Sequence, residues 1–553
     1  MAFPSEGLVP KSVIALRDYD LGKFTKDLIA GITVGLVALP LAMAFAISSG
    51  VKPESGIYCA IVAGFIISAL GGSRCQIGGP TGAFVVVVAG IHAAHGMDGL
   101  FMTTMMAGVL LMILGLTGLG TAVKYIPRPV VLGFTNGIAV LIASTQIKDF
   151  FGLEIAKVPG EFLDRMAAIA GHWHTVSTPA TLLGIGALAT LLVMAKITKR
   201  VPGAIVVLFL GTGIAWALGM PVETIETRFG GIPSGLPALH VPTFRPELIL
   251  PLLSPVLTVT MLGAIESLLS AVVADRMSGD KHNPNIELVA QGVANVMSPL
   301  FGGLPATGAI ARTATNIRAG AQTPIAGMIH AVTLLAVILF AAPLAKHIPL
   351  PLLSAILFVV AYNMGEWKEV PEVIGMGRAP FMVWLITFTL TVFADLTVAV
   401  EAGMILAALL YIGRVTATTT VSRVTPEDVQ AGFAHSLQMN ELPEGVVVYR
   451  IHGPFLFGST DKLDIVSDEL ESLPRVVVLR LRNMNAIDTT GMKSLQNLAD
   501  TLHASDRELI LCGMREQPSQ ILQKAEFHQH IGERNITANL EQAIARARDI
   551  LAG

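Results

Sequence analysis

Long apolar runs, separated by short polar links, follow one another from about residue 28 to residue 412. We expect each run to be a membrane element, although several are shorter than the about 20 residues of an uninterrupted spanning helix. They form two sets of seven around a Gly/Pro-rich link, Pro221–Pro251. The expected elements are Leu28–Ser48, Ile57–Leu70, residues 78–89, Leu100–Leu119, Pro129–Ile147, Leu182–Met194, Ile205–Leu218, Leu252–Ala274, Leu288–Pro299, Leu304–Ile317, Pro324–Leu344, Leu350–Tyr362, Phe381–Phe393 and Val398–Ile412.

Two of these elements are interrupted by glycine and proline. Residues 78–83 read Gly-Gly-Pro-Thr-Gly-Ala, and residues 302–312 read Gly-Gly-Leu-Pro-Ala-Thr-Gly-Ala-Ile-Ala-Arg. Backbone that is left unpaired at membrane depth must be buried in protein or line a wet cavity. We expect an extended approach and then a helix start in each, with Thr307 as a candidate N-cap. A helix start directs free N–H groups and a positive dipole end toward a ligand, which suits an anion, and Arg312 adds a full charge.

Two unrelated sequence words recur at nearly one spacing. The Gly-Gly, Pro and Thr-Gly elements repeat at an offset of about 224–226 residues, and residues 124–129 resemble residues 346–351 at about 222. An odd number of elements in each half makes the two copies enter the membrane from opposite sides. The pattern therefore predicts an inverted repeat, with the ligand site at the interrupted segments.

Composition places the chain in the membrane class and argues against others. Hydrophobic residues make up 53% and charged residues 14%, and the mean hydropathy is +0.66, whereas soluble domains carry about 25% charged residues. The net charge of −3 gives no sign of nucleic-acid binding. Three cysteines at unrelated spacings predict neither a disulfide framework nor a metal cluster. Without a Gly-x-x-x-x-Gly-Lys-Ser/Thr loop for ATP, we expect no cofactor and no enzymatic activity.

Positive residues predict the orientation. The N-terminal lysines and arginines fall on the same side as the groups at 124–128, 196–200, 276–281 and 414, whereas Lys346 and His347 fall on the other side. Both termini are thus expected in the cytoplasm, in a multi-pass protein of the cell's inner (plasma) membrane. Residues 1–26 hold no short apolar core with a cleavage site, so we expect no cleavable signal peptide.

The end of the chain has a soluble pattern. Strand-like runs at Val446–Ile451, Arg475–Leu481 and Leu509–Cys512 alternate with helical patterns at Asp461–Leu473 and Asn539–Leu551, the latter with Asn539 as candidate cap. This alternation predicts a small α/β domain. The expected parts are a cytoplasmic N-terminal segment 1–23, a transmembrane transport domain 24–414 with repeats at about 24–220 and 249–414, a linker 415–440 and a cytoplasmic domain 441–553.

Several long words together resemble the SulP anion-permease family, solute carrier family 26, over essentially the whole chain. They are residues 31–44, the Gly-Gly-Pro-Thr word at 78–81, residues 261–269, residues 281–288, and Ile487-Asp488-Thr489-Thr490-Gly491, which resembles a STAS domain. The resemblance implies a seven-plus-seven inverted repeat with core and gate domains, an anion held between half-helices, an elevator mechanism and a homodimer. Residues 264–269 and 309–312 are most similar to the bacterial branch that takes up C4-dicarboxylic acids, which also suggests acyl carrier protein as a partner.

Candidate anion contacts come from both interrupted segments. Small side chains there let the backbone approach a ligand closely. Some family members have a serine where this chain has Ala311, which leaves more of the binding to N–H groups. The candidates are Thr81, Gly82, Ala83, Thr307, Gly308, Ala309, Ala311 and Arg312.

Glu266 lies in an apolar run with no lysine or arginine within a helical turn. Such a carboxylate should carry a proton, pair with Arg312 or hold a cation. We favour proton coupling, although related bicarbonate permeases have an aspartate here and use sodium. Glu287, Gln291 and Asn295 share one helical face, either to bind a neighbouring helix or, through Glu287, as part of a proton path. Thr490 matches a serine that is phosphorylated in anti-sigma-factor antagonists, but a capping role explains it equally well.

The sequence leaves three functions open. The first is a proton-coupled symporter of C4-dicarboxylates such as succinate and fumarate. The second is a sulfate or bicarbonate transporter, coupled to protons or sodium, or an uncoupled exchanger or channel. The third is a regulatory membrane scaffold that acts through its STAS-like domain. For each of these functions we expect the protein to contact membrane lipid and to have no nucleic-acid partner.

Overall fold

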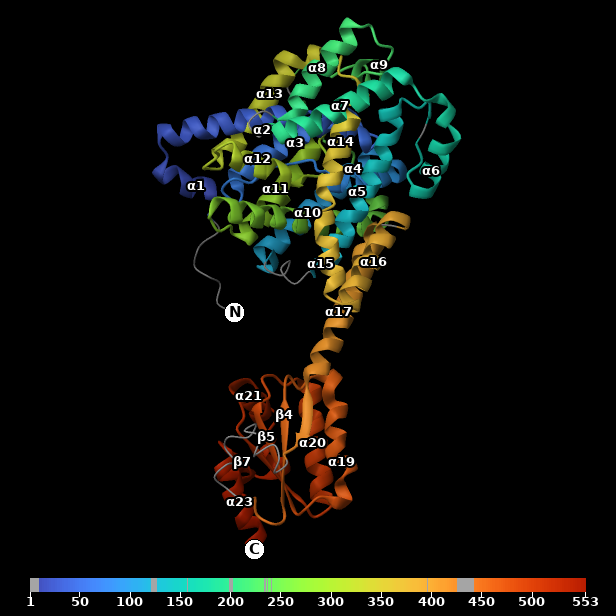
Figure 1. Ribbon diagram of the computed structural model, residues 1–553. Coiled ribbons are helices and arrows are strands. Elements are labelled where there is room, and N and C mark those ends of the chain that lie inside the picture. The colour runs from blue at the N-terminus through green and yellow to red at the C-terminus, as the bar shows by residue number, and fades with distance from the viewer. Residues whose placement is uncertain are drawn as a thin grey trace. The chain divides into compact units, whose positions relative to one another are not determined.

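The computed structural model describes residues 9–120, 127–156, 158–197, 202–232, 235, 237–239, 241–394, 396–424 and 442–553. It divides into two compact units, residues 1–404 and 405–553 (Figure 1). The predicted orientation also counted Lys124, Lys199 and Arg200, which lie outside the described residues. Most of the predicted linker lies outside them too.

The first unit is helical. Among the described residues, nine helices are long and apolar enough to cross a membrane, and α8 and α16 are shorter apolar helices. The first half contains α1 (Lys11–Ala15), α2 (Leu21–Ser48), α3 (Pro53–Leu70), β1 (Gly78–Gly79), η2 (Gly82–Phe84), α4 (Val85–Leu116), α5 (Arg128–Phe151), α6 (Phe162–Gly171), α7 (Thr178–Ile197) and α8 (Gly203–Ala217).

The second half follows a short helix, α9 (Ile225–Phe229). It contains α10 (Ile249–Ser278), α11 (Pro284–Leu300), β2 (Thr307–Gly308), α12 (Ile310–Arg318), α13 (Ile325–Ala345), α14 (Leu350–Met364), α15 (Val370–Gly375), α16 (Arg378–Phe393) and α17 (Leu396–Thr418). Gly96 has a φ of 69° and breaks α4 into two arms. With α4 counted twice, each half supplies seven segments, so the predicted seven-plus-seven fold is confirmed.

The two halves interleave. Helix α2 packs against α13, α4 against α11, and α5 against α14 and α16; Figure 1 accordingly shows blue and yellow-green segments side by side. Glycines permit the close approach: a Cβ at Gly108 would lie 2.7 Å from the carbonyl of Gly292, and a Cβ at Gly292 would lie 2.5 Å from that of Gly108. Each helix thus buries its small face against a helix of the other half.

The polar stretch at residues 150–178, between the fifth and sixth expected elements, includes α6. Arg165 lies on its buried face, where its Nη1 donates to Ser144 Oγ at 2.8 Å and its Nε donates to Pro159 O at 3.1 Å. The bond to Ser144 holds α6 against α5.

The second unit is an α/β domain, as predicted. Its sheet has the order β3-β4-β5-β6-β7, in which β3 (Thr420–Arg423) is antiparallel to β4 (Val446–His452) and the other pairs are parallel. The remaining strands are β5 (Val476–Asn483), β6 (Glu508–Cys512) and β7 (Ile536–Thr537). Asn539 caps the closing helix α23 (Leu540–Ala552), as expected, by accepting from the N–H of Gln542.

Alternation along the strands places side chains on both faces of this sheet. Leu479 faces one apolar cluster, to which α20 (Thr489–Ala504) contributes Leu495, and Val478 faces the other, to which α23 contributes Ile544. The predicted single helix at 461–473 is instead a 3₁₀ segment, η7 (Phe457–Leu463), followed by α19 (Asp464–Asp468) and a further 3₁₀ turn, Leu470–Ser472.

Candidate functional site

The two interrupted segments meet in the first unit. Strands β1 and β2 pair antiparallel, with Gly78 opposite Gly308 and Gly79 opposite Thr307, and the Ala309 N–H donates to Ile77 O at 2.8 Å. The pairing satisfies backbone groups that the membrane could not hydrate. The corresponding interrupted segments of the two repeats therefore lie side by side.

Each strand leads directly into a helix start. Thr81 is extended before η2, which continues into α4, and Ala309 is extended before α12. The N–H groups of Gly82, Ala83 and Ala311 lie in the first turns, where the helix itself offers no acceptor. These are the orphan donors of a helix N-terminus. Ala311 is exposed, whereas Gly82 and Ala83 are buried.

The two predicted contacts Thr307 and Ala309 are already engaged. Thr307 is fully buried and its hydroxyl donates to Gly263 O at 3.0 Å, so it does not cap α12, for which Ala309 occupies the N-cap position. The prediction of a Thr307 cap was wrong because a carbonyl of α10 competes for the hydroxyl. The Thr81 hydroxyl, in contrast, is buried without a partner in the described part of the chain.

Gly308 has no room for a side chain. A Cβ there would lie 1.7 Å from Gln76 Nε2 and 3.1 Å from Ser267 Cα. The same Gln76 Nε2 donates to Ser267 O at 3.1 Å. Gln76, which the sequence pattern did not single out, thus ties the approach to β1 to α10 of the other half.

Arg312 reaches from the second half into the first. Its side chain is 2% exposed, its Nη2 donates to Pro80 O, and its Nη1 lies 2.7 Å from where a Cβ of Gly79 would be. The guanidinium therefore lies behind β1, just before the start of η2, as a fixed buried charge. Within the described ranges it forms no ion pair with Glu266, which was one of the three alternatives.

Glu266 lies on α10, close to β2. Gly263 and Ser267, which are three residues before it and one after it, both contact the β1–β2 region, and Ser270 Oγ lies 3.1 Å from Thr313 Oγ1 of α12. Residues three and four apart share a helical face, so Glu266 borders the face that packs on the site. Glu266 is 9% exposed and has no cationic partner among the described residues. The Glu366 carboxylate acts on it as a like charge.

Glu287 is fully buried and well supplied with donors. Its Oε2 accepts from the N–H groups of Gly72 at 2.9 Å and Ser73 at 3.2 Å, and its Oε1 accepts from Gln291 Nε2 at 2.9 Å. Asn295, one turn further, donates to Ala306 O and accepts from the Ala306 N–H, both at 2.8 Å. These bonds favour the alternative in which this face of α11 holds neighbouring segments in place.

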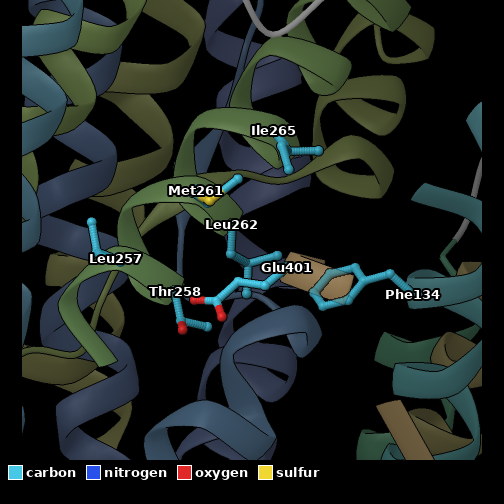
Figure 2. A pocket seen from close by; sticks show the side chains of 7 residues that line it. All are labelled: Phe134, Leu257, Thr258, Met261, Leu262, Ile265 and Glu401. Atoms are coloured by element: carbon cyan, nitrogen blue, oxygen red, sulfur yellow. The ribbon is translucent and has the colours of Figure 1, made fainter. Parts of the chain in front are cut away.

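A narrow cleft with about 20 Å³ of free space separates α10 from α5 and α17. The cleft is lined by Phe134, Leu257, Thr258, Met261, Leu262, Ile265 and Glu401. Figure 2 shows the Glu401 carboxyl group pointing toward Thr258. Glu401 was not among the predicted site residues, although a carboxylate within the apolar run Val398–Ile412 was a visible signal.

In the second unit, Thr490 lines a polar hollow of about 350 Å³ together with Thr460, Asp461, Asp464, Lys493, Ser494 and Asn497. Asp488, rather than Thr490, caps α20: its Oδ1 accepts from the Gly491 N–H at 2.8 Å, and its Oδ2 accepts from the Phe457 N–H at 3.0 Å. No cluster of metal-ligating side chains is found among the described residues.

Lys346 and His347, the positive residues on the unexpected side, lie beside a carboxylate of α9. Lys346 Nζ lies 2.8 Å from Glu226 Oε1, and His347 Nδ1 lies 3.4 Å from Glu226 Oε2. The hydrogen bond and charge of Lys346 lower the pKa of Glu226. Because orientation follows the count of lysines and arginines and not the net charge, this pairing leaves Lys346 as an exception to the predicted orientation.

Comparison with known proteins identifies the family. The sulfate permease family matches residues 24–387 and the STAS domain matches residues 438–543. The putative sulfate transporter YvdB of Bacillus subtilis (strain 168) is 41% identical over 94% of this chain and 97% of that protein.

Solved structures agree with this family. The transmembrane domain of a cyanobacterial bicarbonate transporter, BicA, is 34% identical and covers 70% of this chain and 98% of that one, with a TM-score of 0.61. The murine anion transporter Slc26a9 shares the fold with a TM-score of 0.85 at 16% identity, over 98% of this chain and 94% of that one. The chain belongs to the sulfate permease family, that is, to membrane permeases rather than enzymes, and carries a C-terminal STAS domain.

Proposed function

We propose that this protein is a secondary active transporter of a small anion, which binds between the starts of η2 and α12. The pairing of β1 with β2 carries this proposal, because it brings two helix N-termini and the buried Arg312 to one place. Free N–H groups, two positive dipole ends and a fixed cation all favour a negative ligand. Of the predicted contacts, Gly82, Ala83 and Ala311 offer free N–H groups and Thr81 offers a hydroxyl. Thr307, Gly308 and Ala309 build the strand that positions them.

Glu266 is the proposed proton-coupling group. A buried carboxylate without a cationic partner among the described residues is held more cheaply in its neutral, protonated form. Protonation removes a negative charge beside the site when the anion enters. Glu287 already accepts three hydrogen bonds, so we assign it a structural role and leave the proton path to Glu266.

Two classes of substrate fit the site, C4-dicarboxylates and small inorganic oxyanions. The words at 264–269 and 309–312 favour a C4-dicarboxylate, whereas YvdB is named for sulfate and BicA for bicarbonate. All are compact oxyanions or carboxylates that two helix ends and one arginine can accept. We therefore propose proton-coupled symport of one of these anions by an elevator movement, with fumarate and succinate as the substrates to be tested first.

The surroundings of the site complete the proposal. The multi-pass transport unit would lie in the inner membrane as a homodimer, with both termini and the STAS domain in the cytoplasm. The hollow at Thr490 is a candidate surface for regulation, either by phosphorylation of that residue or by a docking protein such as acyl carrier protein.

Uptake into proteoliposomes tests the proposed function. Purified protein would be reconstituted with an inward proton gradient and radiolabelled fumarate, and then with labelled sulfate and bicarbonate, each in competition with the others. Gradient-driven uptake of one anion above that of protein-free vesicles is expected. Uptake that ignores the proton gradient but follows a sodium gradient or an exchanged anion would reject proton coupling. Failure to move any of the three would leave regulation through the STAS domain as the better proposal.

A further inference from the structure

His330 is a fully buried histidine whose ring has no partner. It lies on α13 with 0% exposure, and in the described part of the chain neither ring nitrogen has a hydrogen-bond partner. The same is true of Nη1 of Arg312. An unpaired buried polar group costs about 1–3 kcal/mol, so groups of this kind are rare and call for an explanation.

Both unpaired groups face the same side of α3. A Cβ at Gly64 would lie 3.6 Å from His330 Cε1 and 3.1 Å from the carbonyl of Gly78. A Cβ at the neighbouring Gly79 would lie 2.7 Å from Arg312 Nη1 and 3.3 Å from Cα of Ala60. Ala60 and Gly64 are one helical turn apart, so the imidazole and Nη1 lie about one turn, roughly 6 Å, from each other behind β1. The Arg312 charge acts electrostatically on the ring.

The backbone that carries His330 is held by close helix packing. Helix α13 packs against α2 at two glycines: a Cβ at Gly35 would lie 3.2 Å from the His330 carbonyl, and a Cβ at Gly31 would lie 2.6 Å from the carbonyl of Ala326. This close contact fixes α13 against α2. On α3 the ring lies beside Gly64, where a Cβ would be in van der Waals contact with Cε1 at 3.6 Å.

We infer that His330 is a positioning residue for Arg312, and that its imidazole supplies the acceptor that Nη1 requires through one enclosed water, because a separation of roughly 6 Å is too long for a direct hydrogen bond. The inference rests on the proposed function, in which the Arg312 charge helps to hold the anion. A neutral imidazole offers one acceptor nitrogen and one N–H, and a guanidinium offers donors only, so the two are complementary. Pro80 O anchors Nη2 from one side, and His330 anchors Nη1 from the other.

The test compares His330→Leu with His330→Asn and His330→Gln, which each retain an acceptor at a position close to one ring nitrogen. Anion affinity and turnover would be measured in proteoliposomes with the substrate that the wild type transports. For His330→Leu we expect KM to rise about tenfold, as for the loss of one hydrogen bond to a charged group, with kcat within about twofold. We expect at least one of the amide variants to restore KM. His92→Leu is the control, because it removes another imidazole, half-buried on α4, whose buried Nδ1 has no hydrogen-bond partner among the described residues.

Two further measurements separate positioning from packing. Thermal unfolding of His330→Leu should show a small loss of stability, because Nη1 is left unpaired, and the amide variant that restores KM should restore the stability as well. In a double-mutant cycle, His330→Leu should add little to the loss caused by Arg312→Met, because the two residues act through one contact. The inference would be overturned by additive losses in the cycle or by an unchanged KM in His330→Leu. It would also be overturned if KM rose and the melting temperature fell and neither amide variant reversed these changes. If Arg312→Met itself left the affinity unchanged, the proposed function would fail first.

Discussion

Replacing Arg312 by methionine removes the charge but keeps most of the side-chain volume. The guanidinium is 2% exposed and bonds to Pro80 O, and Pro80 directly precedes Thr81 and the start of η2. Two or three residues of extended chain span roughly 7–10 Å. An anion at the first-turn N–H groups would therefore lie at about that distance from a charge that salt screens only weakly.

Coulomb's law gives the size of the effect. A unit charge at about 8 Å contributes about 2 kcal/mol when the effective dielectric constant is about 20. Anion affinity should thus fall about 30-fold in Arg312→Met. The loss should appear at every proton gradient, because it concerns the charge on the anion and not its coupling to Glu266.

Equilibrium binding of labelled anion to purified protein measures this loss without the complication of transport rates. Arg318→Met provides the matched control: it removes the same charge from the last turn of the same helix, where the side chain is exposed. Binding that weakens equally in both variants would show only a general effect of net charge. Unchanged binding in Arg312→Met would remove this arginine from the site.

Three other changes test separate parts of the structure. Glu266→Gln should bind the anion and exchange it across the membrane, yet lose uphill uptake driven by protons; full accumulation in this variant would exclude the coupling role. Gly308→Ala should lower the stability by about 1–3 kcal/mol in thermal unfolding, because Gln76 Nε2 lies 1.7 Å from the new Cβ, whereas Gly186→Ala, with open space around it, should not. In the STAS domain, burial and the hydrogen bond to Glu469 raise the pKa of Tyr449 to about 12 from 10.0. The neutral Tyr449 hydroxyl therefore stabilises the folded domain fully below pH 10, and this stabilisation is lost as pH rises through about 12. Tyr449→Phe should flatten the dependence of the unfolding free energy on pH in that range, and an unaltered dependence would contradict this.

The sequence predicted much of the fold because the relevant signals are local. Apolar runs of spanning length, together with Gly-Gly and proline words at matching places, indicated the spans, the two repeats and both helix starts. The α/β end was equally visible, since its strands are short runs of valine and leucine between helical patterns. In each case a single stretch of chain carried its own evidence.

The side-chain partners could not be predicted in the same way, because they come from distant segments. The Thr307 hydroxyl donates to Gly263 O of α10 and not to its own helix, and Arg312 bonds to a proline carbonyl of the other repeat and not to Glu266. Gln76 and His330 gave no periodic or motif signal, and only the packed structure shows that they lie against Gly308 and Gly64. Local pattern thus specifies where a polar residue lies along the chain, whereas its partner depends on the fold.

The β1–β2 pair also bears on how the protein is made. Gly78 leaves the ribosome long before Gly308, its partner across the pair, so this stretch enters the bilayer before its hydrogen-bond partners exist. Closing a contact over so long a separation is slow, and backbone groups exposed to lipid in the meantime are costly. Biogenesis should therefore pass through a stage in which the N-terminal half is inserted but its broken segment is held by the translocation machinery or by neighbouring helices, and chains that stop before residue 308 should be cleared by membrane proteases.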